Sequence, residues 1–347
     1  MNKKYIGADV HTKNTMFCVK DEEGNILDMQ RLPNEDETIM EYLKSYGAEV
    51  VVGFESVTNW GWIANVVERS GAVARMGHPL YLQKGKPRGK KTDGVDADWM
   101  AELLRLNSWP DAYLASYDCR VAREMYRTHV VLTQSITRFK NRLSAVLHKV
   151  NVRKPYKDVF CKRGRKWLVS LKIEPAYHEE ITSLLRVIEC MEQEMKTIEE
   201  MEPKGWLDET AYFHLRSLPG VGDFIARFIL AEAGDIRRFH SAGAFSAWCG
   251  LAPGVDRSDE TVRRKKLRKG SKWLRWAYFI AATQAVKQRG RLQRQFLRIS
   301  IKKGYFPAIM AVAREMAVIS YCMITRNQGY YEPIRFTGQG RRLQRSA

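Results

Sequence analysis

The cysteines of this 347-residue chain are few and scattered. The six of them form no Cys-x-x-Cys pair and no paired Cys/His spacing, which argues against a zinc site and against a disulfide framework. The chain opens without an apolar signal-peptide segment, and we place its longest apolar stretch at residues 276–286, which is too short to span a bilayer. We therefore expect a cytoplasmic protein that does not bind membranes.

Acidic residues are scarce beyond the first third of the sequence. The whole chain has a net charge of +19. Residues 1–112 carry 14 Lys and Arg against 17 Asp and Glu, whereas the remainder carries 44 against 22. A basic surface of this size is typical of proteins that bind polyanions. Anionic lipid is the alternative, but no amphipathic membrane helix or lipidation motif accompanies the charge, so we expect nucleic acid.

Four carboxylates lie where strands end or helices begin in the first 112 residues. Asp9 lies near the end of an apolar strand, and Glu55 ends a valine-rich one. Asp93 and Asp96 begin a helix after the basic loop 84–91, three residues apart and so on one helical face. The patterns predict strands at residues 4–10, 15–19, 25–32, 49–55 and 72–76 and helices at 35–46 and 60–70.

These four carboxylates predict a metal site. Carboxylates gathered in this way repel each other unless a cation neutralises them. Oxygen ligands with positions left for water and phosphate suit Mg²⁺ or Mn²⁺, and two such ions can stabilise the attacking and leaving oxygens of phosphoryl transfer. The alternative is that each acid is an ordinary solvated helix cap. We favour the metal site because two of the acids end strands and two form an Asp-x-x-Asp pair.

The middle of the chain is predicted to form two long helices. Residues 116–150 contain neither Gly nor Pro and repeat apolar residues at three- and four-residue steps, and residues 177–201 share this pattern. We expect an antiparallel coiled coil that acts as a spacer or a dimerising arm. Its basic residues could also follow a phosphate backbone: Arg138, Lys140, Arg142, Lys149, Arg153 and Lys154.

Residues 217–234 have the form of a helix-hairpin-helix. An apolar helix end is followed by the turn PGVG and by a second helix with Ala226 and Ile229 facing inward. Gly220 and Gly222 allow close backbone approach, so that amides at the start of the second helix can hold a phosphate without reading bases. The alternative is a plain turn between two helices.

A run of basic residues without acids follows between residues 262 and 275. Trp273 and Trp276 lie beside these residues, and interleaved aromatics favour nucleic-acid contact over a solvated loop. Ser258 precedes the run in a polar segment, and the pattern alone gives this serine no role. We expect nucleic-acid contacts from Arg263, Arg264, Lys265, Lys266, Arg268, Lys269, Lys272 and Arg275.

Taken together, these motifs resemble the DEDD transposases of the insertion sequence 110 family, which includes pilin-gene inverting recombinases. The resemblance rests on Asp9 in GADVHTKNT, Glu55 in VVGFES, and Asp93 and Asp96 in KTDGVDADWMAELL. The C-terminal part of the family is similar to SLPGVGDFIARFILAEAGDIRRFHSAGAFSAWCGLAPG and RKGSKWLR. Each motif is weak alone, but in this order, with a coiled coil between them, they cover nearly the whole chain.

The resemblance implies a transposase or site-specific DNA recombinase whose four acids, Asp9, Glu55, Asp93 and Asp96, hold Mg²⁺. It implies four parts: an α/β RNase H-like (RuvC-like) domain at 1–112, a helical coiled-coil arm at 113–205, a mainly helical transposase domain with the helix-hairpin-helix at 206–330, and a basic tail at 331–347.

The family also implies a serine nucleophile that forms a covalent phosphoserine with DNA, so that no free double-strand break is released. This serine usually lies in a Ser-Gly motif between the GLAP-like segment and the K-x-G segment. Ser258 is the only serine in that interval, and Asp259 follows it in place of glycine; Ser271 is the second candidate. Activation of a serine hydroxyl by a metal or base would link it to the acids.

The partners that the resemblance implies are donor and target DNA, a structured noncoding bridge RNA that selects them, and three further copies of the chain in a tetramer with composite sites. The expected location is the bacterial or archaeal cytoplasm, at the nucleoid. Two other functions stay open. A metal-dependent junction or RNase H-type nuclease would need the acids without Ser258, and a non-enzymatic nucleic-acid binder would need neither.

Overall fold

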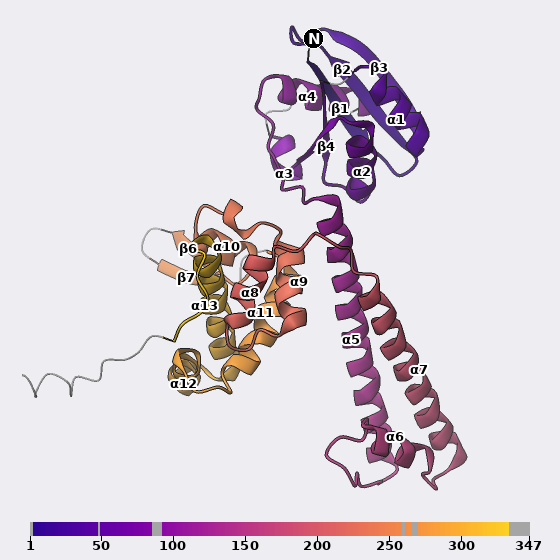
Figure 1. Ribbon diagram of the computed structural model, residues 1–347, viewed down its shortest axis with the longest axis vertical. Coiled ribbons are helices and arrows are strands. Elements are labelled where there is room, and N and C mark those ends of the chain that lie inside the picture. Colours follow the sequence, from indigo (N-terminus) through magenta and orange to yellow (C-terminus); the bar gives the residue numbers. More distant parts are fainter. Residues whose placement is uncertain (1–2, 48, 85–91, 259–260, 266–269, 333–347) are drawn as a thin grey trace, which may run out of the picture. The chain divides into compact units, whose positions relative to one another are not determined.

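The chain folds into two compact units, Met1–Tyr117 and Asp118–Ala347 (Figure 1). The computed structural model describes residues 3–47, 49–84, 92–258, 261–265 and 270–332, and side chains are described outside residues 254–269. The first unit is a mixed α/β structure and the second is mostly helical. This confirms the part of the predicted fold class that expected an α/β structure first and a mainly helical structure after it.

A five-stranded sheet forms the centre of the first unit. Gly24, with φ of 94°, supplies the left-handed residue of the turn between the second and third strands. The first three strands form an antiparallel meander, and the fourth and fifth run parallel to the first. This mixture fits an RNase H-like transposase domain. The strands, in the spatial order β3-β2-β1-β4-β5, are β1 (Lys4–Val10), β2 (Asn14–Lys20), β3 (Ile26–Pro33), β4 (Val50–Glu55) and β5 (Val73–Gly77).

Helices cover both faces of this sheet (Figure 1). On one face, α1 (Asp36–Lys44) and α2 (Trp60–Ser70) bury the side chains that alternate inward along the strands, including Ile6. On the other face, α4 (Asp93–Arg105) packs against β1 and β2, and the short α3 (Pro79–Leu82) follows β5. Side chains alternate between the two faces of each strand. One set therefore packs against α1 and α2, and the other set faces α4.

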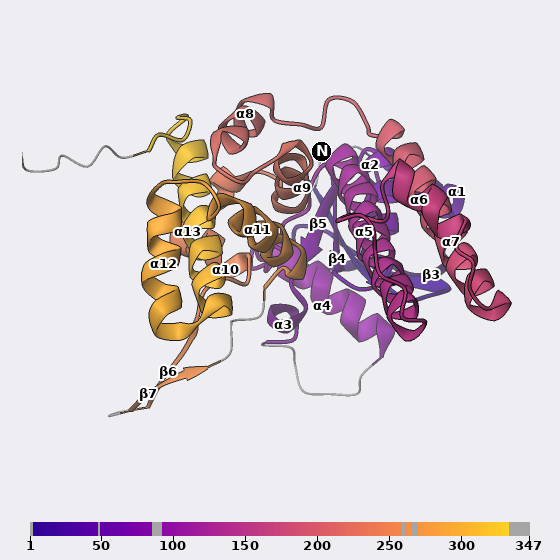
Figure 2. The same ribbon diagram turned by 90° about the horizontal axis from the view of Figure 1, so that it is seen from below.

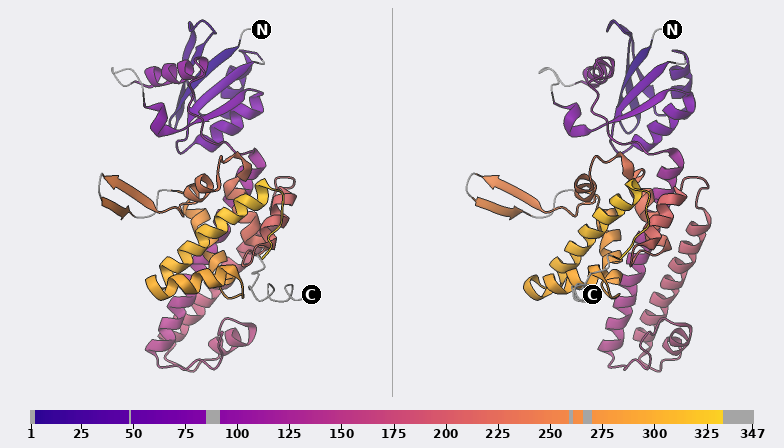
Figure 3. Two further views of the ribbon diagram at one scale, coloured as in Figure 1. Left: turned by 90° about the vertical axis from the view of Figure 1, so that its left-hand side faces the viewer. Right: turned by 60° about the vertical axis from the view of Figure 1, so that its left-hand side comes forward.

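The second unit begins with a pair of long helices, α5 (Tyr117–Lys149) and α7 (Pro175–Glu200), which lie side by side in Figures 1 and 3. A shorter helix, α6 (Lys162–Val169), packs with the far half of α5 and the start of α7. Near the other end, His129 of α5 contacts Glu199 of α7 at 2.9 Å. The start of one helix therefore lies beside the end of the other, and the two run antiparallel.

Part of the basic face predicted along α5 is used inside this helix pair. Lys140 pairs with Glu192 of α7 at 3.4 Å, and Arg142 pairs with Glu180. Cations with carboxylate partners lose much of their attraction for phosphate. The prediction that these two side chains face a nucleic acid is therefore not supported by their contacts.

The rest of the second unit is a helical lobe (Figure 2). Its core contains the fully buried side chains of Phe228, Phe245 and Tyr278. Val130 belongs to the same core, so the first half of α5 packs against the lobe. The elements are α8 (Glu209–Ser217), α9 (Asp223–Ala233), the 3₁₀ helix η1 (Ile236–Arg238), α10 (Ala242–Trp248), β6 (Gly254–Ser258), β7 (Thr261–Lys265), α11 (Lys272–Ala285), α12 (Arg291–Lys303) and α13 (Tyr305–Thr325).

Two predictions about the basic run are corrected. The segment read as a polar loop forms the antiparallel hairpin β6–β7, which extends from the helices in Figure 3. Trp273 and Trp276 are partly buried and pack edge-on against Phe228, with ring centroids 6.4 and 5.6 Å apart. Since these rings contact the core of the lobe, they are not the free stacking platforms that the sequence pattern indicated.

The helix α13 is long and apolar enough to cross a membrane, with a mean hydropathy of 1.5 over its most apolar window. It is more apolar than the stretch at 276–286, which corrects the sequence analysis. Half of that window is buried inside the structure, where α13 packs against α10, α11 and α12. The core helix of a globular lobe has these same properties, so the length of α13 is weak evidence for a membrane span.

Candidate metal centre

Asp9 and Glu55 lie at the same end of the sheet and on the same face. β1 and β4 are parallel neighbours whose register pairs Gly7 with Gly53. Two residues further along each strand, where side chains return to the same face, come Asp9 and Glu55. The register therefore brings the two predicted strand-end carboxylates to neighbouring positions.

The helix α4 approaches this same face closely because Gly7 has no side chain. A Cβ atom at Gly7 would lie 1.9 Å from the carbonyl oxygen of Ala97 and 2.6 Å from the amide nitrogen of Ala101. Ala97 directly follows Asp96 in the first turns of the helix. The close contact thus fixes where α4 begins relative to the strand ends.

The N-cap of α4 is Thr92, and neither aspartate takes that position. The Thr92 hydroxyl accepts a hydrogen bond from the amide of Val95 at 3.4 Å. Asp93 and Asp96 follow inside the first turn, where the helix dipole favours negative charge. The capping role in this helix therefore belongs to Thr92 and to neither aspartate.

A buried lysine fastens α4 to the second strand. Lys20, whose side chain is 8% exposed, pairs with Asp98 at 2.8 Å and with Glu102 at 3.0 Å. A hydrogen bond from Arg105, together with Lys20, lowers the pKa of Glu102 to about 2. A charge removed from water needs such partners. These pairs hold α4 against β2 and so position its first turn.

His11 joins Asp9 and Asp93 into one cluster. Its Nε2 atom lies 3.1 Å from a carboxylate oxygen of Asp9 and 3.4 Å from one of Asp93. One potential ligand atom from each of the three residues lies within 4.8 Å of the others. Arg31 of β3 bonds the second oxygen of Asp93 at 2.6 Å, and this bond, with His11, lowers the pKa of the Asp93 carboxyl.

This donor set fits a divalent cation. Carboxylate oxygens suit Mg²⁺ and Mn²⁺, and an imidazole nitrogen adds a ligand that transition metals accept more readily than Mg²⁺ does. Among the described side chains, Arg31 donates a hydrogen bond to Asp93, and His11 lies beside both aspartates. The structure thus brings Asp9 and Asp93 together, and the register and the helix start place Glu55 and Asp96 at the same end of the sheet.

His11 is the ligand candidate that the sequence analysis missed. It follows Asp9 by two residues in GADVHTKNT, a spacing that returns a side chain to the same face of an extended strand. This spacing was the available signal, but it is weak because a histidine beside a strand end is common. The contact with Asp93, 82 positions away in the sequence, depends on the packing of α4.

The two candidate serines lie in different local structures. Ser258 is the last residue of β6, where its backbone pairs with Thr261, and its side chain is among those not described. Ser271 is the N-cap of α11, and its hydroxyl accepts a hydrogen bond from the amide of Leu274 at 3.2 Å. Ser271 therefore already has a structural role.

The predicted nucleic-acid contacts are described only in part. Arg275 donates a hydrogen bond to the carbonyl oxygen of Gly250 at 3.1 Å, and Lys272 lies over the ring of Trp273 at 4.8 Å from its centroid. Arg263, Arg264 and Lys265 lie in β7 with side chains outside the described set, and Lys266, Arg268 and Lys269 lie outside the described residues.

The two glycines of the LPGVG turn have different surroundings. Gly220 has φ of 83°, and a Cβ atom there would lie 2.2 Å from the carbonyl oxygen of Ala281 and 2.6 Å from the amide nitrogen of Ala285. This glycine lets the turn pack against α11. Gly222 is the N-cap of α9 and faces open space, but Asp223 follows it with a negative charge. Asp223 pairs with Arg227 at 3.3 Å, which partly balances the charge at this helix end.

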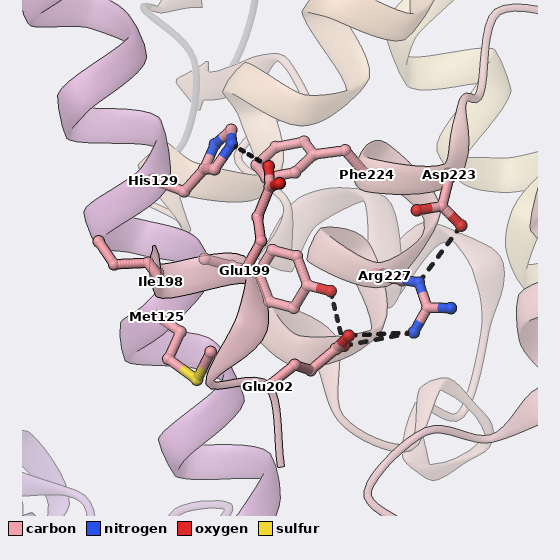
Figure 4. Close-up of a pocket in the computed structure, with 9 residues that line it drawn as sticks. Met125, His129, Ile198, Glu199, Glu202, Asp223, Phe224 and Arg227 are labelled. Carbon is pink, nitrogen blue, oxygen red and sulfur yellow. Dashed lines mark hydrogen bonds and ion pairs between the residues drawn. The ribbon is translucent and has the colours of Figure 1, made fainter. Parts of the chain in front are cut away.

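A pocket of about 290 Å³ lies between α5, the end of α7 and α9 (Figure 4). The Tyr126 hydroxyl donates to Glu202 at 2.7 Å, and Arg227 lies 3.3 Å from both Glu202 and Asp223. His129 contacts Glu199 on the opposite side of the pocket. These contacts connect α5 and the end of α7 to α9.

Two sequence profiles match this chain. The profile of the IS110-type DEDD transposases matches residues 6–152, which include nearly all of the sheet and the four acids predicted to bind metal. The profile described as Transposase IS116/IS110/IS902 family matches residues 213–298 of the helical lobe.

Curated relatives agree with the profiles. A putative transposase of Sinorhizobium fredii is 25% identical over 174 residues, which are 50% of this chain and 42% of that protein. A probable family 20 transposase of Pseudomonas aeruginosa is 22% identical over 251 residues, 68% of this chain and 71% of the relative. The pilin gene-inverting protein of Moraxella bovis is 28% identical over 120 residues, 33% of this chain and 37% of its own length.

The chain thus spans less than half the length of the Sinorhizobium and Moraxella proteins, and more than two thirds of the Pseudomonas one. The two profiles match in the same order as the motifs found in the sequence: the first covers most of the first compact unit and continues to residue 152 of the second, and the other lies within the second unit. By these matches the chain belongs to the IS110 family of transposases.

Proposed function

We propose that this protein is a transposase that cuts and rejoins DNA at a metal centre held by Asp9, Glu55, Asp93 and Asp96. The observation that carries the proposal is the meeting of two parallel strand ends with the first turn of α4, where Asp9, His11 and Asp93 present ligand atoms within 4.8 Å of one another. An arrangement of acids at the end of a sheet suits phosphoryl transfer.

The residues of the proposed centre would have different roles. Mg²⁺ or Mn²⁺, when bound, supplies positive charge to the phosphate under attack and lowers the pKa of a hydroxyl bound beside it. Asp9 and Asp93 would hold this cation, with Glu55 and Asp96 completing the carboxylate set. His11 would orient Asp9 and Asp93, or add its own nitrogen. Arg31 would exchange its bond with Asp93 for one with the DNA phosphate.

The nucleophile in this proposal is Ser258. Its hydroxyl would lose its proton as the oxygen forms a bond to the phosphorus of the DNA backbone. The bond from phosphorus to the departing sugar oxygen would break, and that oxygen would gain a proton in exchange. The product is a phosphoserine that keeps the energy of the phosphodiester, so a sugar hydroxyl of another strand can reverse the step and join the DNA. The support for Ser258 is its place in the family motif order.

The remaining parts of the proposal concern assembly. We take residues 1–112 as the RNase H-like catalytic domain, 113–205 as a coiled-coil arm, 206–330 as the transposase domain with a helix-hairpin-helix, and 331–347 as a basic tail. A tetramer would combine acids and serine from different copies. A bridge RNA would choose donor and target DNA in the cytoplasm, at the nucleoid, because the basic regions suit backbone contact and leave base pairing to read the sequence.

The test is a reaction of the full chain with DNA taken from both sides of its gene, together with RNA transcribed from that DNA. We expect recombined DNA and a protein–DNA adduct, both lost when a chelator removes the metal. Cleavage without any adduct would instead indicate a nuclease that acts through metal alone. Binding without cleavage in any metal would contradict an enzymatic role.

A further inference from the structure

The helix α12 exposes apolar side chains that helices of this kind normally bury. Leu292 is its one buried residue, and the helix packs against α13. Leu297 is 50% exposed and Ile301 is 86% exposed. Spacings of three and four residues bring these two to one side of α12 together with Arg298 and Lys302. The face therefore combines apolar and basic groups.

Positive charge on this face is not balanced by acids. Residues 287–306 contain seven Lys and Arg and no Asp or Glu. Arg294 is paired with Glu332 at 3.1 Å. In the part of the chain that the structure describes, Arg298, Lys302 and Lys303 are exposed and have no ion-pair partner. Three adjacent cations are therefore left to bind an anion from outside the chain.

Two aromatic rings lie where α12 ends and α13 begins. Gly304, with φ of 80°, makes the sharp turn that sets Tyr305 and Phe306 beside the last cations of α12. Tyr305 packs edge-on against Phe296, and Phe306 packs against Phe279, with ring centroids 5.6 and 5.5 Å apart. Both rings stay more than half exposed, at 55% and 65%. Each ring is thus held on one side and open on the other.

We propose that this surface, formed by Arg298, Ile301, Lys302, Lys303, Tyr305 and Phe306, binds unpaired nucleotides of an RNA. The three cations would contact successive phosphates, and the two rings would stack on unpaired bases. Exposed aromatics beside a basic groove are the usual means of binding single-stranded nucleic acid. The inference depends on one part of the proposed function, namely that the chain binds nucleic acid.

The physical properties of the face favour RNA over other occupants. Unpaired bases are a permanent feature of the loops of folded RNA, whereas the bases of duplex DNA are already stacked on each other. A second copy of the same face would meet it with charge of the same sign. The surface is also separate from the basic run at 262–275, so it would add to any contacts made there.

The experiment measures binding of the full chain to a short RNA without self-complementarity, by fluorescence anisotropy across a salt series. Replacing Tyr305 and Phe306 by alanine should weaken binding about tenfold or more without changing the salt dependence, since stacking is not ionic. The triple change Arg298→Gln, Lys302→Gln and Lys303→Gln should lower the slope of log affinity against log salt by about 2.

A matched control lies one helical turn away. Arg294→Gln removes the same charge as Arg298→Gln, but from a side chain that already pairs with Glu332, so its slope should change much less. Thermal unfolding of each variant checks the fold, and Phe306→Tyr, which keeps a ring, should restore binding lost in Phe306→Ala.

Several outcomes would overturn the inference. Equal RNA affinity in all variants would show that this face is not used. A loss confined to duplex or single-stranded DNA would contradict the assignment to RNA. A loss of binding to anionic phospholipid vesicles, or a change in oligomeric state on sedimentation, with RNA binding intact, would assign the face to a membrane or to a second copy. If the wild-type chain binds no nucleic acid at all, the proposed function fails as well.

Discussion

At the residue scale, His11 changes the account of the metal centre most. Four acids were predicted from strand ends and a helix start, and the structure adds an imidazole between two of them. Nitrogen ligands are accepted more readily by Mn²⁺ than by Mg²⁺. In the proposed centre, His11 would therefore influence which cation binds, although it is not one of the four acids.

His11→Gln should lower the affinity of the protein for Mn²⁺ more than its affinity for Mg²⁺, because the amide replaces a nitrogen ligand by oxygen. Isothermal titration calorimetry of the full chain with each cation measures both. His178→Gln is the control, since His178 binds the carbonyl oxygen of Val169 on the helical arm. Equal losses for both cations would mean that His11 only orients the carboxylates.

A comparison of two alanine variants shows which of the two candidate serines is the nucleophile. Ser258→Ala should abolish the protein–DNA adduct while DNA binding is kept, because it removes a single hydroxyl. Ser271→Ala should keep the adduct and lower stability by about 1 kcal/mol, the usual effect of losing an N-cap. Mass spectrometry of the digested adduct identifies the attached peptide. An adduct that maps to Ser271 would reverse the assignment.

At the scale of elements, the position of α4 decides whether the acids meet. The contact at Gly7 and the pairs of Lys20 with Asp98 and Glu102 hold this helix on the sheet. None of these residues is one of the four predicted metal-binding acids. A change at these contacts should therefore act on the metal centre through the helix.

Gly7→Ala should destabilise the first unit by about 1–3 kcal/mol or more, because its Cβ would overlap the backbone of α4. Differential scanning calorimetry of the full chain measures the change. Gly61→Ala is the matched control, since nothing lies within 4 Å of a Cβ atom there and alanine favours the helix α2. Equal stability of the two variants would contradict the close packing of α4.

The sequence predicts the elements better than their contacts. Apolar alternation and runs predict the five strands, and the long periodic segments predict α5 and α7. The inward positions of Ala226 and Ile229 in α9 are confirmed, since both are fully buried. The hairpin β6–β7 was missed because its basic residues hide the strand pattern. The prediction that Trp273 and Trp276 contact nucleic acid relied on the local charge pattern. That pattern does not indicate that both rings pack against Phe228 in the core of the lobe.

At the scale of the whole molecule, charge divides the chain. The first 112 residues are slightly acidic, and the rest has twice as many Lys and Arg as Asp and Glu. Association with nucleic acid should therefore depend strongly on salt, because each cation that contacts a phosphate releases a counterion.

Replacing Arg263, Arg264, Lys265 and Lys266 together by glutamine should lower the slope of log DNA affinity against log salt by about 3–4, if all four contact phosphates of duplex DNA. Filter binding or anisotropy with a DNA duplex measures it. A similar change in Arg142, which pairs with Glu180, serves as a single-charge control. An unchanged slope would mean that this run faces solvent.

The most direct test of the central claim compares two glutamates of the first unit. Glu55 ends β4 beside Asp9, and Glu37 is exposed in the first turn of α1. The substrate is DNA taken from both sides of the gene, and the measurement is the amount of it that the full chain cuts in Mg²⁺. The account predicts that Glu55→Gln cuts no more DNA than wild type does in chelator, while Glu37→Gln cuts as wild type does. Undiminished cutting by Glu55→Gln, or by wild type in chelator, would contradict a metal centre at the strand ends.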